Sequence, residues 1–246
     1  MSGHSKWHNI QAKKGKTDAA RGAMFTKLGR ELAVAAKGNP NPDTNSKLAD
    51  AIAKAKAANM PNDTIKRSIA KAAGELGDKD YKELTYEGYG VGGAAVIINT
   101  LTDNVNRTAG DVSAAMKKYG GNMGVMGCVS YLFDKKGYIA VERTATLDDD
   151  TMMEYCLEAG ADDYTAQDDA YEVYCAPENF SAVRGYLEGK GLNFFEAAVK
   201  MIPQSYISLD EEKLETFRKM LDRLNELDDV QDVYHNVEMP EEDDED

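Results

Sequence analysis

The spacing of apolar side chains divides the chain into a helical first quarter and a mixed remainder. In residues 18–36, in residues 45–58 and from residue 62 onward, apolar positions recur every three or four residues, as on one face of an amphipathic helix. Glycine and proline residues separate the three stretches. Three short, alanine-rich helices predict a small bundle that ends near residue 77.

The rest of the chain alternates between runs typical of strands and runs typical of helices. Between residues 136 and 205 the predicted order is β-α-β-β-α-β, which is the ferredoxin-like arrangement. An earlier β-α-β run and a final helix and strand surround this segment and can complete a second sheet. The expected strands are 94–101, 128–133, 138–141, 164–165, 171–175, 194–200 and 230–236, and the expected helices are 105–118, 147–159, 180–189 and 211–227.

These patterns predict an α+β fold class. We expect an N-terminal three-helix domain followed by two ferredoxin-like-type α/β domains, the third inserted in the second. The expected boundaries are 1–77 for a basic arm with the helices, 78–135 plus 206–240 for the discontinuous α/β domain, 136–205 for the inserted domain and 241–246 for an acidic tail.

Glycines in residues 86–93 have the spacing of a dinucleotide-binding fingerprint. Gly88, Gly90 and Gly93 match G-x-G-x-x-G. That fingerprint follows a strand and opens a helix, because the helix N-terminus holds the pyrophosphate, whereas these glycines precede the β-branched run at 94–101. We therefore expect a turn or bulge that enters the strand, and no cofactor.

Charge is distributed very unequally along the chain. Residues 1–77 carry 14 Lys and Arg against 6 Asp and Glu, a net charge of +8, whereas residues 78–246 carry 15 against 37, a net charge of −22. A cationic module in an acidic chain indicates an electrostatic partner, most often nucleic acid. A drift of charge that serves solubility alone would give the same pattern.

The basic module is best explained by phosphate binding. Cations on an arm and on helix faces neutralise phosphates without a fixed geometry, and Trp7 can stack on a base. The alternative is a solvated helix face with the Trp packed on its own domain. The candidate nucleic-acid-binding residues are Lys6, Trp7, Lys13, Lys14, Lys16, Arg21, Lys27, Arg30, Lys66 and Arg67.

The junction at residues 102–108, Thr-Asp-Asn-Val-Asn-Arg-Thr, is unusually polar for the passage from a strand to a helix. Asp103 is placed to cap the helix that follows. A cap explains neither Asn106 nor Arg107. We therefore predict a possible partner contact at Asn104, Asn106 and Arg107.

Catalytic and metal-binding signatures are scarce. The sequence has no H-E-x-x-H, G-x-S-x-G, G-x-x-x-x-G-K-[ST] or C-x-x-C motif, and two of its three His lie in the arm. Cys128, Cys156 and Cys175 are widely spaced, so they suggest buried thiols rather than a disulfide framework or a zinc site. We expect a protein that is not an enzyme and has no metal, cofactor or small-molecule substrate.

Apolar runs are short throughout the chain. None approaches the roughly 18 residues of a membrane helix, and the N-terminus lacks the apolar stretch of a signal peptide. No heptad seam or long apolar stripe demands a dimer. The expectation is a cytoplasmic monomer that does not associate with membranes.

Several motifs together resemble the YebC/PmpR family. They are Gly3-His4-Ser5-Lys6-Trp7, the run 25–32 (Phe-Thr-Lys-Leu-Gly-Arg-Glu-Leu), the run 59–65 (Asn-Met-Pro-Asn-Asp-Thr-Ile), Tyr86-Glu87-Gly88-Tyr89-Gly90, Gly120-Gly121-Asn122 and the run 229–236 (Asp-Val-Gln-Asp-Val-Tyr-His-Asn). The resemblance spans almost the full chain. Residues 123–128, Met-Gly-Val-Met-Gly-Cys, depart from it, because a more polar loop is expected there.

The resemblance implies three domains and a non-enzymatic regulator of gene expression. Bacterial members are described as DNA-binding transcriptional regulators, which is the first hypothesis. The related mitochondrial translational activator of cytochrome c oxidase subunit I acts on protein synthesis, so the second is a ribosome-associated translation factor that binds structured RNA through the basic domain. The exposed cations are mainly Lys, which suits shape-tolerant contact with RNA better than reading of DNA bases.

Overall fold

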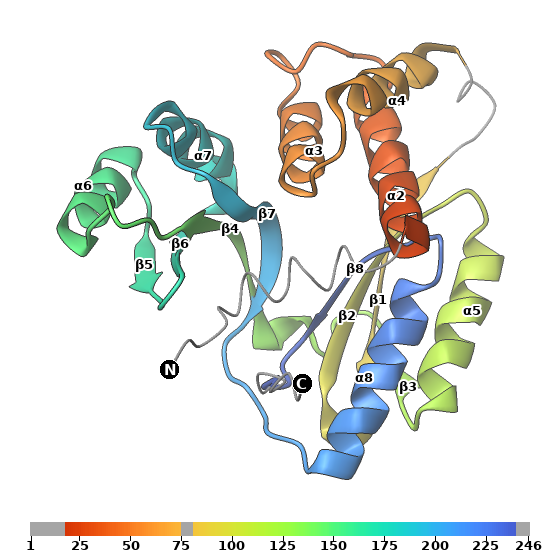
Figure 1. Cartoon of the computed structure of the whole chain (residues 1–246). Helices are drawn as coiled ribbons and strands as arrows, with labels where there is room; N and C mark the ends of the chain where they lie inside the picture. The colour runs from red at the N-terminus through yellow and green to blue at the C-terminus, as the bar shows by residue number, and fades with distance from the viewer. Residues whose placement is uncertain (1–17, 75–80, 240–246) are drawn as a thin grey trace. The chain divides into compact units, whose positions relative to one another are not determined.

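The computed structural model describes residues 18–74 and 81–239 (Figure 1). The chain separates into two compact units, each of which takes in two stretches of sequence. Residues 1–78 and 135–200 belong to the first unit, and residues 79–134 and 201–246 belong to the second.

The first stretch of the first unit is a helical bundle. Helix α2 (Asp18–Ala36) packs against α3 (Ser46–Ala57) and α4 (Asn62–Gly74). The three predicted helices are therefore confirmed, and their apolar stripes meet in one core. Its buried members are Leu28, Leu32, Ala36, Leu48, Ala51, Ala55, Met60 and Ile65.

One asparagine joins the end of α2 to the start of α3. The side-chain oxygen of Asn45 caps α3 by accepting a hydrogen bond from the Leu48 N–H at 3.2 Å. The side-chain amide of Asn45 donates to the carbonyl oxygens of Ala35 and Asn39, both at 2.7 Å. Backbone groups that a helix end leaves without an intrahelical partner are thereby satisfied on both sides of the turn.

The second stretch of the first unit has the ferredoxin-like order. Its elements are β4 (Phe133–Glu142), α6 (Asp149–Ala159), β5 (Asp163–Ala166), β6 (Ala170–Cys175), α7 (Phe180–Gly189) and β7 (Phe194–Pro203), and its sheet runs β5-β6-β4-β7. Alternate residues of β4 and β6, such as Ile139 and Val173, meet α6 and α7 in one buried core. The predicted β-α-β-β-α-β order is confirmed.

The second unit contains a permuted version of the same sheet. Its elements are β1 (Lys82–Tyr89), β2 (Ala95–Thr102), α5 (Val105–Lys118), β3 (Asn122–Met123), α8 (Glu211–Asn225) and β8 (Val230–His235), with strand order β3-β1-β2-β8. Strand β1, first in sequence, lies between β2 and β3, where a ferredoxin-like sheet has its third strand. Helices α5 and α8 lie side by side along this sheet (Figure 1).

The predicted fold class is confirmed, but in the second unit one predicted strand was wrong and one observed strand was not predicted. Residues 128–133 do not form a strand: Ser130–Leu132 is a 3₁₀ turn, and Phe133 begins β4. The strand that follows α5 in this sheet is instead β3, the two-residue strand at Asn122–Met123. Strand β1 was not predicted, since its polar residues lack a continuous apolar run.

Candidate nucleic-acid interface

Helix α4 presents three cations on one side. Ile65 is buried against the bundle and Ile69 is half-buried, whereas Lys66, Arg67 and Lys71 are exposed. With 3.6 residues per turn, Arg67 and Lys71 fall on the side of the helix opposite the two isoleucines, and Lys66 falls on the flank between the two sides. The predicted site residues Lys66 and Arg67 are thus brought together, and Lys71 joins them.

The cations of α2 are less accessible than their sequence pattern indicates. Arg21 is exposed, but Lys27 and Arg30 are half-buried, and all three have interactions within the chain. Across the bundle, Lys54 of α3 forms an ion pair of 3.2 Å with Glu31 of α2. Part of the positive charge of α2 and α3 therefore serves contacts inside the bundle, and the exposed face of α4 remains the clearest cationic surface.

Other predicted site residues lie outside the described ranges. Lys6, Trp7, Lys13, Lys14 and Lys16 belong to residues 1–17, so their arrangement stays a prediction. The described helical stretch alone, residues 18–74, carries ten Lys and Arg against five Asp and Glu, a net charge of +5. The helical stretch is therefore basic even without the arm.

The polar junction before α5 is organised by one buried carboxylate. Asp229, 8% exposed, accepts hydrogen bonds at its Oδ2 atom from Thr108 Oγ1 at 2.7 Å, Thr102 Oγ1 at 3.2 Å and Arg107 Nη2 at 2.7 Å. Arg107 also pairs with Asp103 at 2.9 Å. Burial alone would raise the pKa of Asp229, but the bonds from Arg107, Thr108 and Thr102 outweigh it and hold the pKa below its ordinary value.

These contacts assign an internal role to most of the junction. The N-cap of α5 is Asn104, which accepts from the Arg107 N–H at 3.1 Å, so the expectation that Asp103 caps the helix was wrong. Arg107 and Thr108 tie α5 to the turn before β8. Asn106 is exposed. A partner contact at Asn104, Asn106 or Arg107 stays a prediction, and the junction does not need one to explain its polarity.

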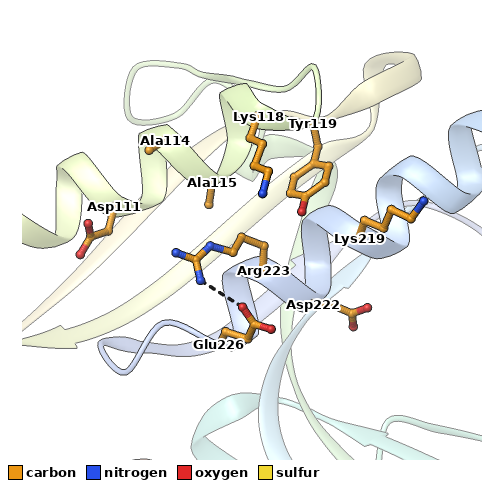
Figure 2. Close-up of a pocket in the computed structure, with 9 residues that line it drawn as sticks. All are labelled: Asp111, Ala114, Ala115, Lys118, Tyr119, Lys219, Asp222, Arg223 and Glu226. Carbon is orange, nitrogen blue, oxygen red and sulfur yellow. Dashed lines mark hydrogen bonds and ion pairs between the residues drawn. The ribbon is translucent and has the colours of Figure 1, made fainter.

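A cavity of about 530 Å³ lies between α5 and α8 (Figure 2). Its charged lining consists of three cations and three anions, namely Lys118, Lys219, Arg223, Asp111, Asp222 and Glu226. Arg223 is already paired with Glu226 at 3.0 Å, and Lys118 lies 5.4 Å from the centre of the Tyr119 ring. Because these charges balance, the cavity offers no net attraction to a phosphate polymer.

The cysteines have the properties of unreactive thiols. Cys156 and Cys175 are buried, and burial raises the pKa of each to about 11. Cys128 is only half-buried, contrary to the prediction of three buried thiols, and burial again raises its pKa. A thiol is nucleophilic as its thiolate, so raised pKa values disfavour cysteine chemistry at neutral pH.

The described residues contain neither a metal-binding cluster nor a membrane-spanning helix. Over residues 18–74 and 81–239, no three His, Cys, Asp or Glu side chains gather as they would around a metal ion. Within the same ranges, no helix combines the length and apolar character needed to cross a bilayer.

Family models match nearly the whole chain. Residues 5–75 match the "TACO1/YebC protein N-terminal domain", and residues 81–237 match the "TACO1/YebC second and third domain". The two models therefore divide the chain between the helical bundle and the α/β remainder.

Curated relatives and a solved structure agree with these models. A "Probable transcriptional regulatory protein" of Clostridium botulinum (strain Eklund 17B / Type B) is 58% identical over 98% of both chains, and one of Acetivibrio thermocellus is 55% identical over 96% of this chain and 98% of its own. The crystal structure of a conserved hypothetical protein from Aquifex aeolicus matches with a TM-score of 0.80 and 43% identity, over 93% of this chain and 95% of that one. The relatives' names support a regulatory role. This chain belongs to the TACO1/YebC family.

Proposed function

We propose that this protein is a non-enzymatic, DNA-binding transcriptional regulator that contacts phosphates through its helical bundle. The observation that carries the proposal is the exposed face of α4, which presents Arg67 and Lys71 opposite the packed side of the helix and Lys66 on its flank. Cations on one helix face bind the phosphate backbone and release its counterions, which gives affinity that falls steeply with salt.

Three further observations support this function. The acidic remainder of the chain limits indiscriminate binding to polyanions, so contact is confined to the basic module. The relatives with 55–58% identity are named as probable transcriptional regulatory proteins. None of the buried carboxylates Glu87, Glu172 and Asp229 requires a catalytic explanation, since each accepts hydrogen bonds from neighbouring groups.

A second candidate is a ribosome-associated factor that binds structured RNA with the same face. Seven of the ten cations in residues 18–74 are Lys and three are Arg. Lys contacts phosphates as a point charge, whereas reading of base edges in the major groove relies on Arg, Asn and Gln. A face dominated by Lys is therefore compatible with folded RNA as well as with duplex DNA.

The test compares two double variants that change charge equally. Lys66→Glu with Arg67→Glu reverses the α4 face, and Lys117→Glu with Lys135→Glu reverses two exposed cations outside the bundle. Binding to a labelled promoter fragment is titrated at several salt concentrations with competitor DNA. We expect the α4 variant to bind about tenfold or more weakly, and we expect the slope of log affinity against log salt concentration to be about 2 smaller in magnitude. The control variant should keep the affinity and the slope of the wild type.

Ribosome binding is measured in parallel by sedimentation of purified ribosomes with each variant. Promoter binding that survives competitor and depends on the α4 face supports the transcriptional proposal. The opposite result is loss of promoter binding at a modest competitor concentration, together with ribosome cosedimentation that depends on the α4 face. That result would favour the ribosome-associated function. Equal loss in both variants would show that the α4 face is not the interface.

A further inference from the structure

The loop between β3 and β4 carries apolar side chains into solvent. Val125 is 78% exposed, Met126 is 86% exposed and Tyr131 is 65% exposed. Over the residues that the structure describes, these are three of the four most exposed large hydrophobic side chains. Scattered exposed apolar residues are ordinary, but three within seven positions form a patch that calls for an explanation.

A buried charge holds this loop in place. The carboxylate of Glu87, a residue only 5% exposed, accepts hydrogen bonds from the backbone N–H groups of Gly127, Val129 and Ser130, each at 2.9 Å. Burial would raise the pKa of Glu87, but these backbone donors outweigh it and lower the pKa. Burying a carboxylate is costly unless it is fully hydrogen-bonded, so the loop is fixed by an interaction that tolerates little movement.

The tip itself is a tight turn. The Cys128 N–H donates to the Val125 carbonyl oxygen at 3.1 Å, and Gly127 has a φ of 87°, the conformation that a type II turn requires at its third residue. The hydroxyl of Tyr89 donates to the Cys128 carbonyl oxygen at 2.9 Å. With the turn closed from both sides, Met126 is held at the outermost position.

The lack of cations in the loop and the negative charge of its unit disfavour a polyanion as the partner of this tip. Residues 119–133 contain no Lys, Arg, Asp or Glu. The unit that carries the loop, residues 79–134 and 201–246, has 9 Lys and Arg against 22 Asp and Glu, a net charge of −13. Phosphate binding needs cations, and an acidic body repels nucleic acid and anionic lipid alike.

We propose that Val125 and Met126, flanked by Tyr131, form a docking tip that inserts into an uncharged, apolar pocket on a partner protein. Met and Tyr are enriched in the buried cores of protein interfaces. Because Glu87 fixes the loop before binding, association does not have to order it, and a small contact gains affinity. This inference does not depend on nucleic-acid binding by the helical bundle.

The first stage of the test identifies what the tip touches. A photoreactive amino acid replaces Met126 in the full chain, and in a matched protein it replaces Glu212, an exposed residue of α8. After irradiation in cells, we expect one nuclease-resistant protein adduct from position 126 and none from position 212. An adduct to nucleic acid, to lipid or to the chain itself, or the absence of any adduct, would overturn the proposal.

The second stage measures affinity with the purified cross-linked protein as the probe. Titrations compare the wild-type chain with Met126→Ser, Val125→Ser and the control Glu212→Gln. We expect each tip variant to bind at least tenfold more weakly and the control to bind as the wild type does. These substitutions are exposed and do not remove a described hydrogen bond, so folding is retained. Unchanged affinity in both tip variants would refute the docking role.

Discussion

The second unit contains two segments that are each organised by one buried carboxylate, yet they present opposite surfaces. Asp229 accepts mainly from the side chains of Thr102, Arg107 and Thr108, so the polar groups of the junction turn inward. Glu87 accepts from backbone N–H groups of the β3–β4 loop, which leaves the side chains of Val125, Met126 and Tyr131 exposed. A buried carboxylate that binds side chains uses them to stabilise the fold. A buried carboxylate that binds backbone N–H groups leaves exposed side chains available to contact a partner.

The largest expected effect sharpens this contrast through stability. Asp229→Ala leaves Arg107, Thr102 and Thr108 without their shared acceptor, and we expect it to lower the free energy of unfolding by about 3 kcal/mol. Urea denaturation measures the change. Asp103→Ala removes only the partly exposed partner of Arg107 and should cost much less. Equal losses in the two variants would mean that Asp229 is not the organising group.

The next effect concerns the loop. Glu87→Gln keeps the size of the side chain but replaces one accepting oxygen by a donor, which faces backbone donors, so we expect a loss of about 2 kcal/mol. Hydrogen exchange should accelerate at the amides of Gly127, Val129 and Ser130. Asp229→Ala serves as the control, because it should leave the relative protection of these three amides unchanged. If these three amides remain protected from exchange in Glu87→Gln, Glu87 does not hold the loop and the contrast with Asp229 fails.

Acid should weaken both segments together. The pKa values of Asp229 and Glu87 are lowered in the folded protein, so the unfolded chain binds more protons as pH falls. Their stabilisation is complete above the ordinary carboxyl pKa values of about 4 and is lost as pH falls through the lower folded values. Unfolding measured from pH 6 to pH 3 should therefore be less pH-dependent in Glu87→Gln and in Asp229→Asn than in the wild type. A slope identical to that of the wild type in both variants would contradict the assignment.

The smallest expected effect is the most diagnostic. Met126→Ser should change the free energy of unfolding by no more than about 0.5 kcal/mol, because the side chain is exposed and makes no core contact. Chemical denaturation measures this value, with Met116→Ser as a buried methionine control that should be strongly destabilised. A marked loss of stability from Met126→Ser would mean that the tip packs within the chain.

The sequence predicted the elements whose signal is local. Helices 105–118 and 180–189 have the predicted bounds, because apolar periodicity and a glycine at or just after the end mark each segment locally. Residues 128–133 look like a strand in isolation, but Glu87, some forty positions earlier, captures their backbone N–H groups. Strand β1 was not predicted for a related reason, because its strand conformation depends on distant residues. Gly88 and Tyr89 are strand residues because β2 and β3 pair with them.

The candidate site shows the same division between local and distant information. Periodicity within α4 was enough to place Lys66 and Arg67 on an exposed face. The partial burial of Lys27 and Arg30 depends on neighbouring helices that no local pattern encodes. A partner contact was predicted for Arg107 because no acceptor is close to it in sequence. Its acceptor, Asp229, lies 122 positions away.

The strand order β3-β1-β2-β8 imposes an order of events on synthesis. Strand β2 pairs with β8, which is translated roughly 130 residues later, and Val96 and Ile98 share their core with Phe217 and Met220 of α8. At ribosomal rates of about 5–20 residues per second, the nascent sheet waits on the order of ten seconds for its edge strand. Meanwhile, residues 135–200 emerge complete. We expect ribosome-arrested chains ending near residue 240, which still hold β8 inside the exit tunnel, to protect the inserted segment from protease while β2 remains cleavable.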